Sequence, residues 1–266
     1  MYSYFAVGED KLGKEIVVYT AITGSYDSLS SVKEEEGIDY IVFTDQDFSG
    51  VIPKPWKHIR LPASRLNNKD LARFCKLNPH RLLPTYNKSL WLDGNIVIKS
   101  EIKKLILDTL ENDYIASYDH WWRDKTEQEF LECALLGHDF ILNLRNQYCR
   151  YKKDGYSSYN FFENNVIFRQ HMDENVVKMH DLWWGEYLRG GKRDQYSFTY
   201  ASYKVGIVIK SMGLHDPRIV KRYFDYKKHS KNKPLKEKIL MRVNRAIQFV
   251  YPWNVSEPQR ENSLLK

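Results

Sequence analysis

Two oxygen-bearing side chains at positions 93 and 95 are the clearest candidates for chemistry in the sequence. Asp93-Gly94-Asn95 directly follows Ser89-Leu90-Trp91-Leu92, an apolar run typical of a buried strand. The glycine lets a ligand approach the backbone. Mg²⁺ and Mn²⁺ prefer oxygen ligands, and often take one or two carboxylates with water and substrate phosphates. The pattern therefore predicts a divalent-cation site, although Asp-Gly is also an ordinary turn signal.

Acidic residues follow two further strand-like runs. Ile16 to Tyr19 leads into a turn-rich segment that ends at Asp27, and Asp39 to Phe43 leads into Asp45. Ligands bind at the carboxyl edge of open α/β sheets, so acids that recur there predict one shared pocket. Turns favour Asp and Asn in any case, which leaves a purely structural role open for each of them.

A row of basic residues lies between these strands. Ala63 to Leu77 has a helical composition, and four cations recur in it at intervals of 4, 4 and 3 residues, which would put them on one helix face. They are Arg65, Lys69, Arg73 and Lys76. Like charges repel, so the row predicts an anionic ligand such as a nucleotide diphosphate, unless acids from elsewhere cover it. A solvated basic face is the alternative. His80 would bring an imidazole near the same end.

The remaining pattern alternates strands with helices. Strands are predicted at 114–118, 165–168 and 206–210, and helices at 125–137, 173–188 and 194–203. This alternation predicts an α/β fold with a mostly parallel sheet flanked by helices. A chain of 266 residues fits one such domain, which we place at residues 1–226, with a basic linker and helical tail at 227–266.

Charge is unevenly distributed along the chain. Residues 218–266 carry a net charge of +9 and residues 1–217 a net charge of −2. This argues against a nucleic-acid-binding face on the body and favours a basic tail that meets an anionic surface, with membrane lipid ahead of nucleic acid.

The tail from Leu235 to Tyr251 has the pattern of an amphipathic helix. Its predicted apolar stripe consists of Leu235, Ile239, Val243, Ala246, Ile247 and Val250, with Lys236, Lys238, Arg242 and Arg245 mostly elsewhere. Such a helix suits a membrane interface. Packing against the body or a second subunit is the alternative, and in either case we expect the stripe to be buried.

The sequence favours a cytoplasmic location. Residues 1–14 have no apolar stretch like that of a signal peptide, and no run approaches the roughly 18 apolar residues of a membrane span. Cys75, Cys133 and Cys149 are odd in number and lack CxxC spacing, as expected of reduced thiols. The basic tail leaves open a peripheral position at the inner membrane face.

Five motifs occur in an order that resembles one family. They are Tyr19–Asp27, Asp39–Asp45, Asn78–His80, Ser89–Asn95 and Arg193–Phe198. Over residues 16–205 the chain resembles a glycosyltransferase-like family, long catalogued as a domain of unknown function, with plant Golgi and bacterial polysaccharide-cluster members. The resemblance implies a GT-A-type, Rossmann-like fold and a nucleotide-sugar donor. Asp93 and Asn95 stand where other GT-A enzymes carry Asp-x-Asp, and a neutral amide holds a cation less strongly than a carboxylate.

With the resemblance, the candidate residues receive roles. The donor would contact Thr20, Thr23, Asp27, Asp45, Arg65, Lys69, Arg73, His80, Asp93 and Asn95. A Mn²⁺ or Mg²⁺ ion would bind Asp93, Asn95 and His215, which follows the last predicted strand, although a loop histidine without a role is equally expected there. The catalytic candidates are Asp194, Glu163 and Asp93, with Asp194 either the general base or a helix cap. Asn164, Trp184 and Trp122 would bind the acceptor.

The resulting hypothesis is a glycosyltransferase. It would move a sugar from a nucleotide-diphosphate donor to a glycan or lipid-linked acceptor, in surface polysaccharide synthesis, with no nucleic-acid partner. The alternative, motivated by Asn95, is a non-catalytic protein of the same fold that binds a nucleotide sugar or glycan.

Overall fold

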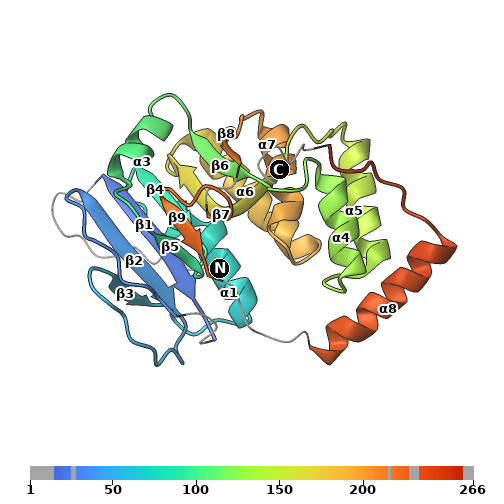
Figure 1. The fold of residues 1–266 in the computed structure, drawn as a ribbon, viewed down its shortest axis with the longest axis horizontal. Coiled ribbons are helices and arrows are strands. Elements are labelled where there is room, and N and C mark those ends of the chain that lie inside the picture. Colours follow the sequence, from blue (N-terminus) through green and yellow to red (C-terminus); the bar gives the residue numbers. More distant parts are fainter. Residues whose placement is uncertain (1–14, 25–27, 215–216, 228–233, 260–266) are drawn as a thin grey trace.

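A seven-stranded sheet forms the centre of the computed structural model, which describes residues 15–24, 28–214, 217–227 and 234–259 (Figure 1). The strand order is β3-β2-β1-β4-β7-β6-β8. The strands are β1 Ile16–Ile22, β2 Ile38–Thr44, β3 Lys57–Arg60, β4 Lys88–Leu92, β6 Ile115–Asp119, β7 Phe162–Arg169 and β8 Lys210–Leu214. Neighbouring strands are parallel except where β7 pairs antiparallel with β4 and β6. The predicted mostly parallel α/β sheet is confirmed.

Helices cover both faces of this sheet. The helices before α8 (Leu235–Val250) are α1 Asn68–Leu77, α2 Pro79–Leu82, α3 Lys103–Thr109, α4 Thr126–Leu135, α5 Ile141–Lys153, α6 Glu174–Arg189 and α7 Gln195–Val205, of which α4 and α5 lie beside the sheet (Figure 1). Odd-numbered residues of β1, such as Val17 and Tyr19, pack in one cluster with α1, α6 and α7. Even-numbered residues, such as Ile16 and Val18, pack in a second cluster with α3. Strand periodicity therefore divides the core into two layers.

Two of the predicted boundaries are wrong. The helix predicted from Ala63 begins at Asn68, because the side chain of Asn67 accepts a hydrogen bond from the amide of Asp70 and caps the first turn. The strand predicted at 206–210 lies later, at β8, because Gly206 ends α7 with a φ of 76°. The predicted cap at Asp173 is confirmed, since its side chain accepts from the amides of Asn175 and Val176.

Strand β7 is also longer than predicted, starting at Phe162 instead of position 165. Because β7 runs against its neighbours, its first residues lie at the same edge as the carboxyl ends of β4 and β6. The Asp93 amide donates a hydrogen bond to the Asn165 carbonyl at 2.9 Å, and the His120 amide donates to the Phe161 carbonyl at 2.8 Å. The first residues of β7 include polar side chains that are buried, and this is why the sequence pattern predicted a later start for the strand.

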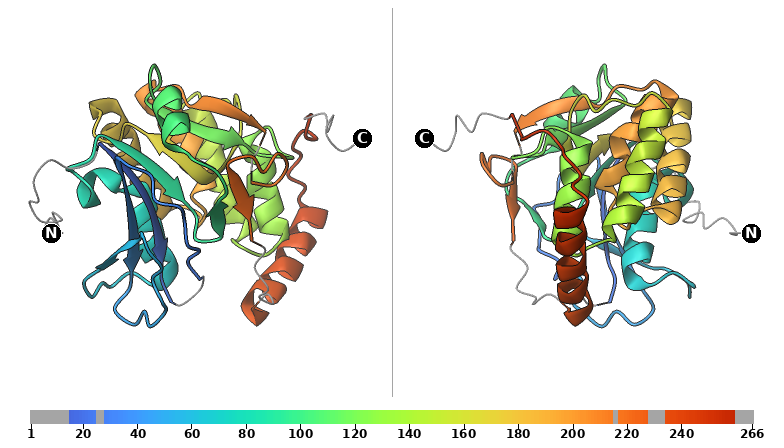
Figure 2. Two further views of the ribbon diagram at one scale, coloured as in Figure 1. Left: turned by 60° about the vertical axis from the view of Figure 1, so that its left-hand side comes forward. Right: turned by 90° about the vertical axis from the view of Figure 1, so that its right-hand side faces the viewer.

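The C-terminal part of the chain returns to the body. A two-stranded sheet pairs β5 Ile96–Ile98 with β9 Phe224–Tyr226, and α8 Leu235–Val250 lies at the periphery against α4 and α5 (Figure 2). Trp253 packs in a third cluster with Phe130 and Tyr148. In the described ranges, helices are all too short or too polar to cross a bilayer.

Candidate functional site

Four charged side chains meet beside the carboxyl end of β4. Lys76 Nζ lies 3.0 Å from Asp93 Oδ1 and 2.6 Å from Asp194 Oδ2. Arg73 Nε lies 3.0 Å from the other carboxylate oxygen of Asp194. We call Arg73, Lys76, Asp93 and Asp194 the charged quartet. It joins α1, the turn after β4 and the start of α7.

The quartet is closed at one end and open at the other. The side chains of Lys76 and Asp194 are 1% and 5% exposed, whereas that of Asp93 is 27% exposed. Buried charges need partners of opposite sign, and here two cations face two carboxylates. Asp93 is therefore the carboxylate of the quartet that a ligand can reach, and Arg73, which is 25% exposed, is its accessible cation.

Asp194 is held in its charged form. Burial by itself acts to raise the pKa of this carboxyl, but Arg73 and Lys76 outweigh that effect and hold its pKa well below the usual range. Its side chain makes no capping hydrogen bond to α7, and Trp183 Nε1 donates to its carbonyl at 2.7 Å. The helix-cap alternative is therefore wrong, and a buried, strongly acidic carboxylate is a poor general base.

Asp93 is oriented by two donors on one oxygen. Trp91 Nε1 donates to Asp93 Oδ1 at 2.7 Å, and Lys76 Nζ donates to the same atom. Lys76 also lies over the Trp91 ring, 5.7 Å from its centroid. Sequence reasoning placed Lys76 in the row of cations for an anionic ligand and not beside Asp93, and it assigned no role to Trp91. The signal was available, because Lys76 stands between Cys75 and Leu77, two residues expected in the core.

The predicted row of four cations is divided in the structure. Arg65 precedes α1 and Lys69 lies in its first turn, and both are exposed. Arg73 and Lys76 are covered by Asp194 and Asp93. The prediction that all four share one helix face is wrong because the Asn67 cap leaves Arg65 outside the helix. Only the exposed pair retains charge for an anionic ligand.

His80 lies in a different setting from the quartet. Its Nε2 is 3.2 Å from Asp181 Oδ1 of α6, and its ring centroid is 6.1 Å from that of His180. Burial lowers the pKa of His80, while Asp181 opposes this effect. The structure thus groups this predicted donor residue with α6 and not with Asp93.

The ends of β1 and β2 hold the other donor candidates. Thr20 Oγ1 and Asp45 Oδ1 are buried and have no hydrogen-bond partner among the described residues. The other Asp45 oxygen accepts from the amide of Gly24, and Thr23 Oγ1 donates to the Asn68 carbonyl at 2.6 Å. Thr23 thus ties β1 to α1, whereas Thr20 and Asp45 keep free oxygens at this edge. Asp27 lies outside the described residues.

Glu163 and Asn164 stand at the start of β7. Asn164 is fully buried with φ at 60°, and neither atom of its amide group has a hydrogen-bond partner within the described ranges. A non-glycine residue at positive φ stores strain, and such strain clusters at ligand sites. Burial raises the pKa of Glu163, an effect that Arg218, with its Nε at 3.2 Å, opposes. Glu163 is therefore better suited than Asp194 to exchange a proton.

The two tryptophans predicted to bind an acceptor differ in exposure. Trp122 is 44% exposed, and the loop that carries it is held by His120, whose Nδ1 accepts from the amides of Trp122 and Arg123. Trp184 is 6% exposed and stacks on Tyr187 in the core, with ring centroids 5.5 Å apart. The acceptor role for Trp184 is wrong because its ring already fills the core.

The predicted metal ligands form an incomplete set. Asp93 Oδ1 is already engaged, so its second oxygen remains, and Asn95 Nδ2 donates to the Lys227 carbonyl at 3.2 Å. Within the described ranges no three His, Cys, Asp or Glu side chains gather as a metal site. His215 lies outside them. Asp93 and Asn95 thus fit a cation only as two ligands of a shell that a substrate completes.

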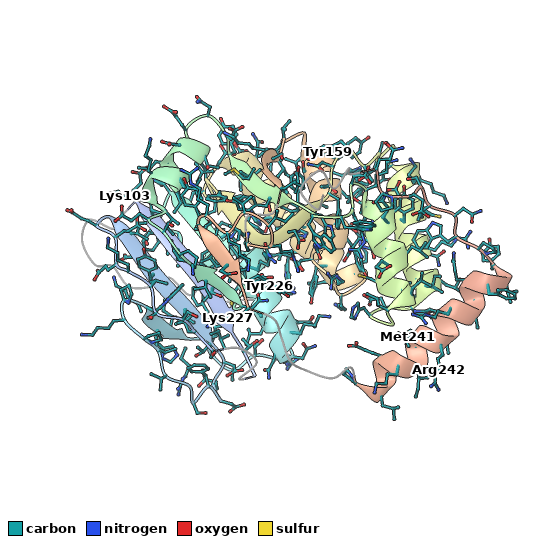
Figure 3. The ribbon with its side chains drawn as sticks, viewed as in Figure 1. Lys103, Tyr159, Tyr226, Lys227, Met241 and Arg242 are labelled. Carbon is teal, nitrogen blue, oxygen red and sulfur yellow. The ribbon has the colours of Figure 1, made fainter. Side chains whose placement is uncertain are left out.

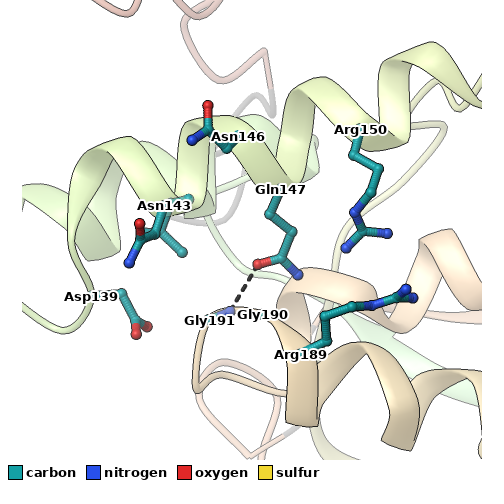
Figure 4. A pocket seen from close by; sticks show the side chains of 9 residues that line it. Asp139, Asn143, Asn146, Gln147, Arg150, Arg189, Gly190 and Gly191 are labelled. Carbon is teal, nitrogen blue, oxygen red and sulfur yellow. Dashed lines mark hydrogen bonds between the residues drawn. The ribbon is translucent and has the colours of Figure 1, made fainter.

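A separate pocket of about 540 Å³ opens between α5 and the loop from α6 to α7 (Figure 4). Its lining is polar and contains Asn143, Asn146, Gln147, Arg150 and Arg189, among others. Gln147 Oε1 accepts from the amide of Gly191 at 2.8 Å, and Arg150 and Arg189 both pair with Glu186. None of the predicted site residues lines it.

The fold and the site together define an α/β protein with charged and buried polar side chains at the carboxyl edge of an open sheet, the edge at which sheets of this kind bind ligands. The sequence profile of the TOD1/MUCI70 glycosyltransferase-like domain matches residues 11–215, and the chain belongs to this family. The motif resemblance found in the sequence is thereby confirmed. No curated protein matches the chain.

Three solved structures illustrate the range of similar folds, each at 10% sequence identity. The bifunctional glycosyltransferase WbbM has a TM-score of 0.45, with 90% of this chain and 45% of WbbM covered. The galactosyltransferase LgtC has a TM-score of 0.43, with 87% and 95% covered. Mouse xyloside xylosyltransferase 1 has a TM-score of 0.43, with 76% and 85% covered. This chain thus spans less than half the length of WbbM.

Proposed function

We propose that this chain is a glycosyltransferase that moves a sugar from a nucleotide-diphosphate donor to a glycan or lipid-linked acceptor. The observation that carries the proposal is the charged quartet, which presents the carboxylate of Asp93 at the ligand-binding edge of the sheet. Glu163, on the neighbouring strand, supplies a carboxyl group with a raised pKa at the same edge. Membership of a glycosyltransferase-like family supports this assignment.

In this proposal the nucleotide lies across the ends of β1 and β2. The unpartnered oxygens of Thr20 and Asp45 accept hydrogen bonds from its base and ribose. Arg65 and Lys69 are exposed and form no ion pair within the described ranges, so they bind the diphosphate. Arg73 acts indirectly, because it is committed to Asp194.

A Mn²⁺ or Mg²⁺ ion fits the proposal as a cofactor that arrives with the donor. The free oxygen of Asp93 and the side-chain carbonyl of Asn95 would hold it together with the diphosphate. Such an ion stabilises negative charge on the departing diphosphate. The first Asp93 oxygen stays fixed by Lys76 and Trp91, which orients the carboxylate.

The transfer step is a substitution at the anomeric carbon. An acceptor hydroxyl oxygen forms a bond to that carbon while the bond to the diphosphate oxygen breaks, and the electron pair leaves with the diphosphate. Glu163 takes the hydroxyl proton, and Arg65 and Lys69 stabilise the charge on the leaving group. Asn164 and Trp122 bind the acceptor, since Asn164 has a free buried amide and Trp122 an exposed ring.

Replacing Asp93 tests the proposal. Purified chain is incubated with a panel of UDP- and GDP-sugars, methyl glycosides as acceptors, and Mn²⁺ or Mg²⁺, and released UDP or GDP is measured by chromatography. We expect Asp93→Asn to lower turnover by about 100-fold or more, because the charge at the reacting diphosphate is removed. Asp108→Asn, an exposed acid of α3 paired with Lys104, should turn over normally.

Two outcomes would contradict the proposal. Full turnover by Asp93→Asn would exclude Asp93 from the chemistry. A wild-type chain whose melting temperature rises with UDP or GDP but which releases no nucleotide from any donor would favour the non-catalytic binding protein.

A further inference from the structure

Helix α8 packs on the body through a mixed side that has a polar residue at its centre. Asn244 is fully buried, and its Nδ2 donates to the carbonyls of Ala134 and Asp139 at 2.7 and 2.8 Å. Its Oδ1 accepts from the amide of Ile141 at 3.1 Å. Met241 lies on this side of the helix, toward α4, and Arg242 lies on the opposite side (Figure 3). The three hydrogen bonds of Asn244 are therefore the buried polar part of this contact with the body.

The apolar side chains of α8 lie mostly on the side turned away from the body. Leu235 is 73% exposed, Ile239 54%, Val243 43% and Val250 81%. Phe249 is 87% exposed as well. The expectation that the apolar stripe is buried is therefore wrong for Leu235, Ile239, Val243 and Val250, whereas Ile247 packs on the third core cluster. Asn244 takes the body-facing position because its side chain pairs with the buried amide of Ile141 and the carbonyl of Asp139.

Basic residues border this exposed stripe. At 3.6 residues per turn, Lys238, Arg242 and Arg245 lie along one side of it and Lys236 along the other. The only acid of the helix, Glu237, is turned to the body, where Oε2 lies 3.5 Å from His138 Nδ1. We call Leu235, Ile239, Val243, Phe249 and Val250, with these four cations, the outer face of α8.

We propose that the outer face of α8 binds the surface of an anionic lipid membrane. Apolar side chains in the centre enter the acyl boundary, and the flanking cations meet lipid phosphates. With 16 residues, α8 is about 24 Å long, which suits a helix lying in the plane of the interface. Docking on a second copy of the chain is disfavoured, because a two-fold contact would set this cationic patch against itself.

Vesicle sedimentation tests this surface on the full-length chain. Vesicles of phosphatidylcholine alone are compared with vesicles in which one third of the lipid is phosphatidylglycerol. We expect binding to be at least about tenfold tighter to the anionic vesicles, because several cations contribute. The double variant Ile239→Glu/Val243→Glu should lose this binding while its circular dichroism stays unchanged, since both side chains are exposed.

Charge variants distinguish the recognition of anionic lipid from nonspecific adsorption to vesicles. Lys238→Glu/Arg242→Glu should lose the preference for phosphatidylglycerol. Lys152→Glu/Lys153→Glu, with the same charge change on exposed positions of α5, should keep it. The proposal would be overturned if both charge variants lost the preference for phosphatidylglycerol to the same extent. It would also be overturned if the wild-type chain bound anionic vesicles no more tightly than neutral ones. A dimer in light scattering that Ile239→Glu/Val243→Glu converts to monomer, without vesicle binding, would assign the outer face to a second copy.

Discussion

At the scale of single residues, three carboxyl groups have different roles because their surroundings differ. Asp194 is buried between two cations and stays charged, which makes it a structural anion. Asp93 shares Lys76 but keeps a free oxygen at the surface. Glu163 is buried with one guanidinium at its edge, and its pKa is raised. Of the three, only Glu163 combines a position at the carboxyl edge of the sheet with a pKa raised toward neutral pH.

A pH–rate profile checks the role of Glu163. The group must be deprotonated to act as a base, so kcat/KM should rise with pH through an apparent pKa above the ordinary value of about 4.3 for glutamate. Glu163→Gln should lower kcat/KM by about 10² to 10⁴-fold and remove this acidic limb. The measurement is initial-rate kinetics with saturating acceptor between pH 4 and 9.

The control is Glu174→Gln, which changes the same chemical group at an exposed position of α6. It should retain both rate and profile. If Glu163→Gln kept the acidic limb, another group would be the base, and Glu163 would have only a structural role.

At the scale of elements, α8 depends on a few specific contacts. Besides Asn244, the approach of the helix requires a residue without a side chain at position 137. A Cβ on Gly137 would lie 2.1 Å from the Glu237 carbonyl oxygen, and this glycine has a φ of 80°. Gly137 of the body and Asn244 of the helix therefore both fix the position of α8.

Removing the Asn244 side chain should release α8 without unfolding the sheet. Asn244→Ala removes the partner of the buried Ile141 amide and of the Asp139 carbonyl, each at a cost of about 1–3 kcal/mol, whereas the Ala134 carbonyl still accepts from the amide of Gly137. Hydrogen exchange of amides in 235–250 should then accelerate at least about tenfold, while amides of β1 and β4 keep their protection. Mass spectrometry of exchanged peptides measures both regions in one experiment.

Arg245→Ala is the neighbouring control, because Arg245 is exposed and adjacent to Asn244. Its exchange pattern should match the wild type. Unchanged protection of α8 in Asn244→Ala would show that packing, and not these hydrogen bonds, holds the helix.

At the scale of the whole molecule, the charged quartet connects distant parts of the chain. Arg73 and Lys76 belong to α1, Asp93 follows β4, and Asp194 precedes α7. A buried ion pair contributes little net stability, yet removing one partner leaves the other uncompensated. The quartet therefore makes the packing of α1 on α7 depend on matched charges.

Breaking the quartet should destabilise the protein as a whole. We expect Lys76→Met to lower the free energy of unfolding by about 3–5 kcal/mol at pH 7, measured by urea denaturation. The lowered pKa of Asp194 means that its contribution is present above about pH 4, the unfolded value, and is lost as pH falls below it. The difference in the free energy of unfolding between the wild type and Lys76→Met should therefore become smaller as the pH falls below about 4.

Lys178→Met removes an exposed i,i+4 ion pair of α6 for comparison. This substitution should change the free energy of unfolding by no more than about 0.5 kcal/mol, both at pH 7 and below about pH 4. A similarly small effect of Lys76→Met would mean that the quartet is not coupled to folding.

Much of the architecture was predictable from local sequence. Short apolar runs, helical composition, the cap at Asp173 and the acids after β2 and β4 each depend on residues close together in the chain. These patterns are sufficient for the alternating α/β order and for a ligand edge that includes Asp45 and Asp93. The motif order was likewise sufficient for the family.

Only the tertiary structure decided which charged groups pair with each other and which side of α8 faces away from the body. Lys76 and Asp194 are 118 positions apart in the sequence, so no local pattern could show that one neutralises the other. The antiparallel direction of β7 brought Glu163 and Asn164 to the site, and Asn244 turned the apolar stripe of α8 outward. Periodicity is a property of neighbouring residues, whereas burial and charge pairing depend on segments that meet only after folding.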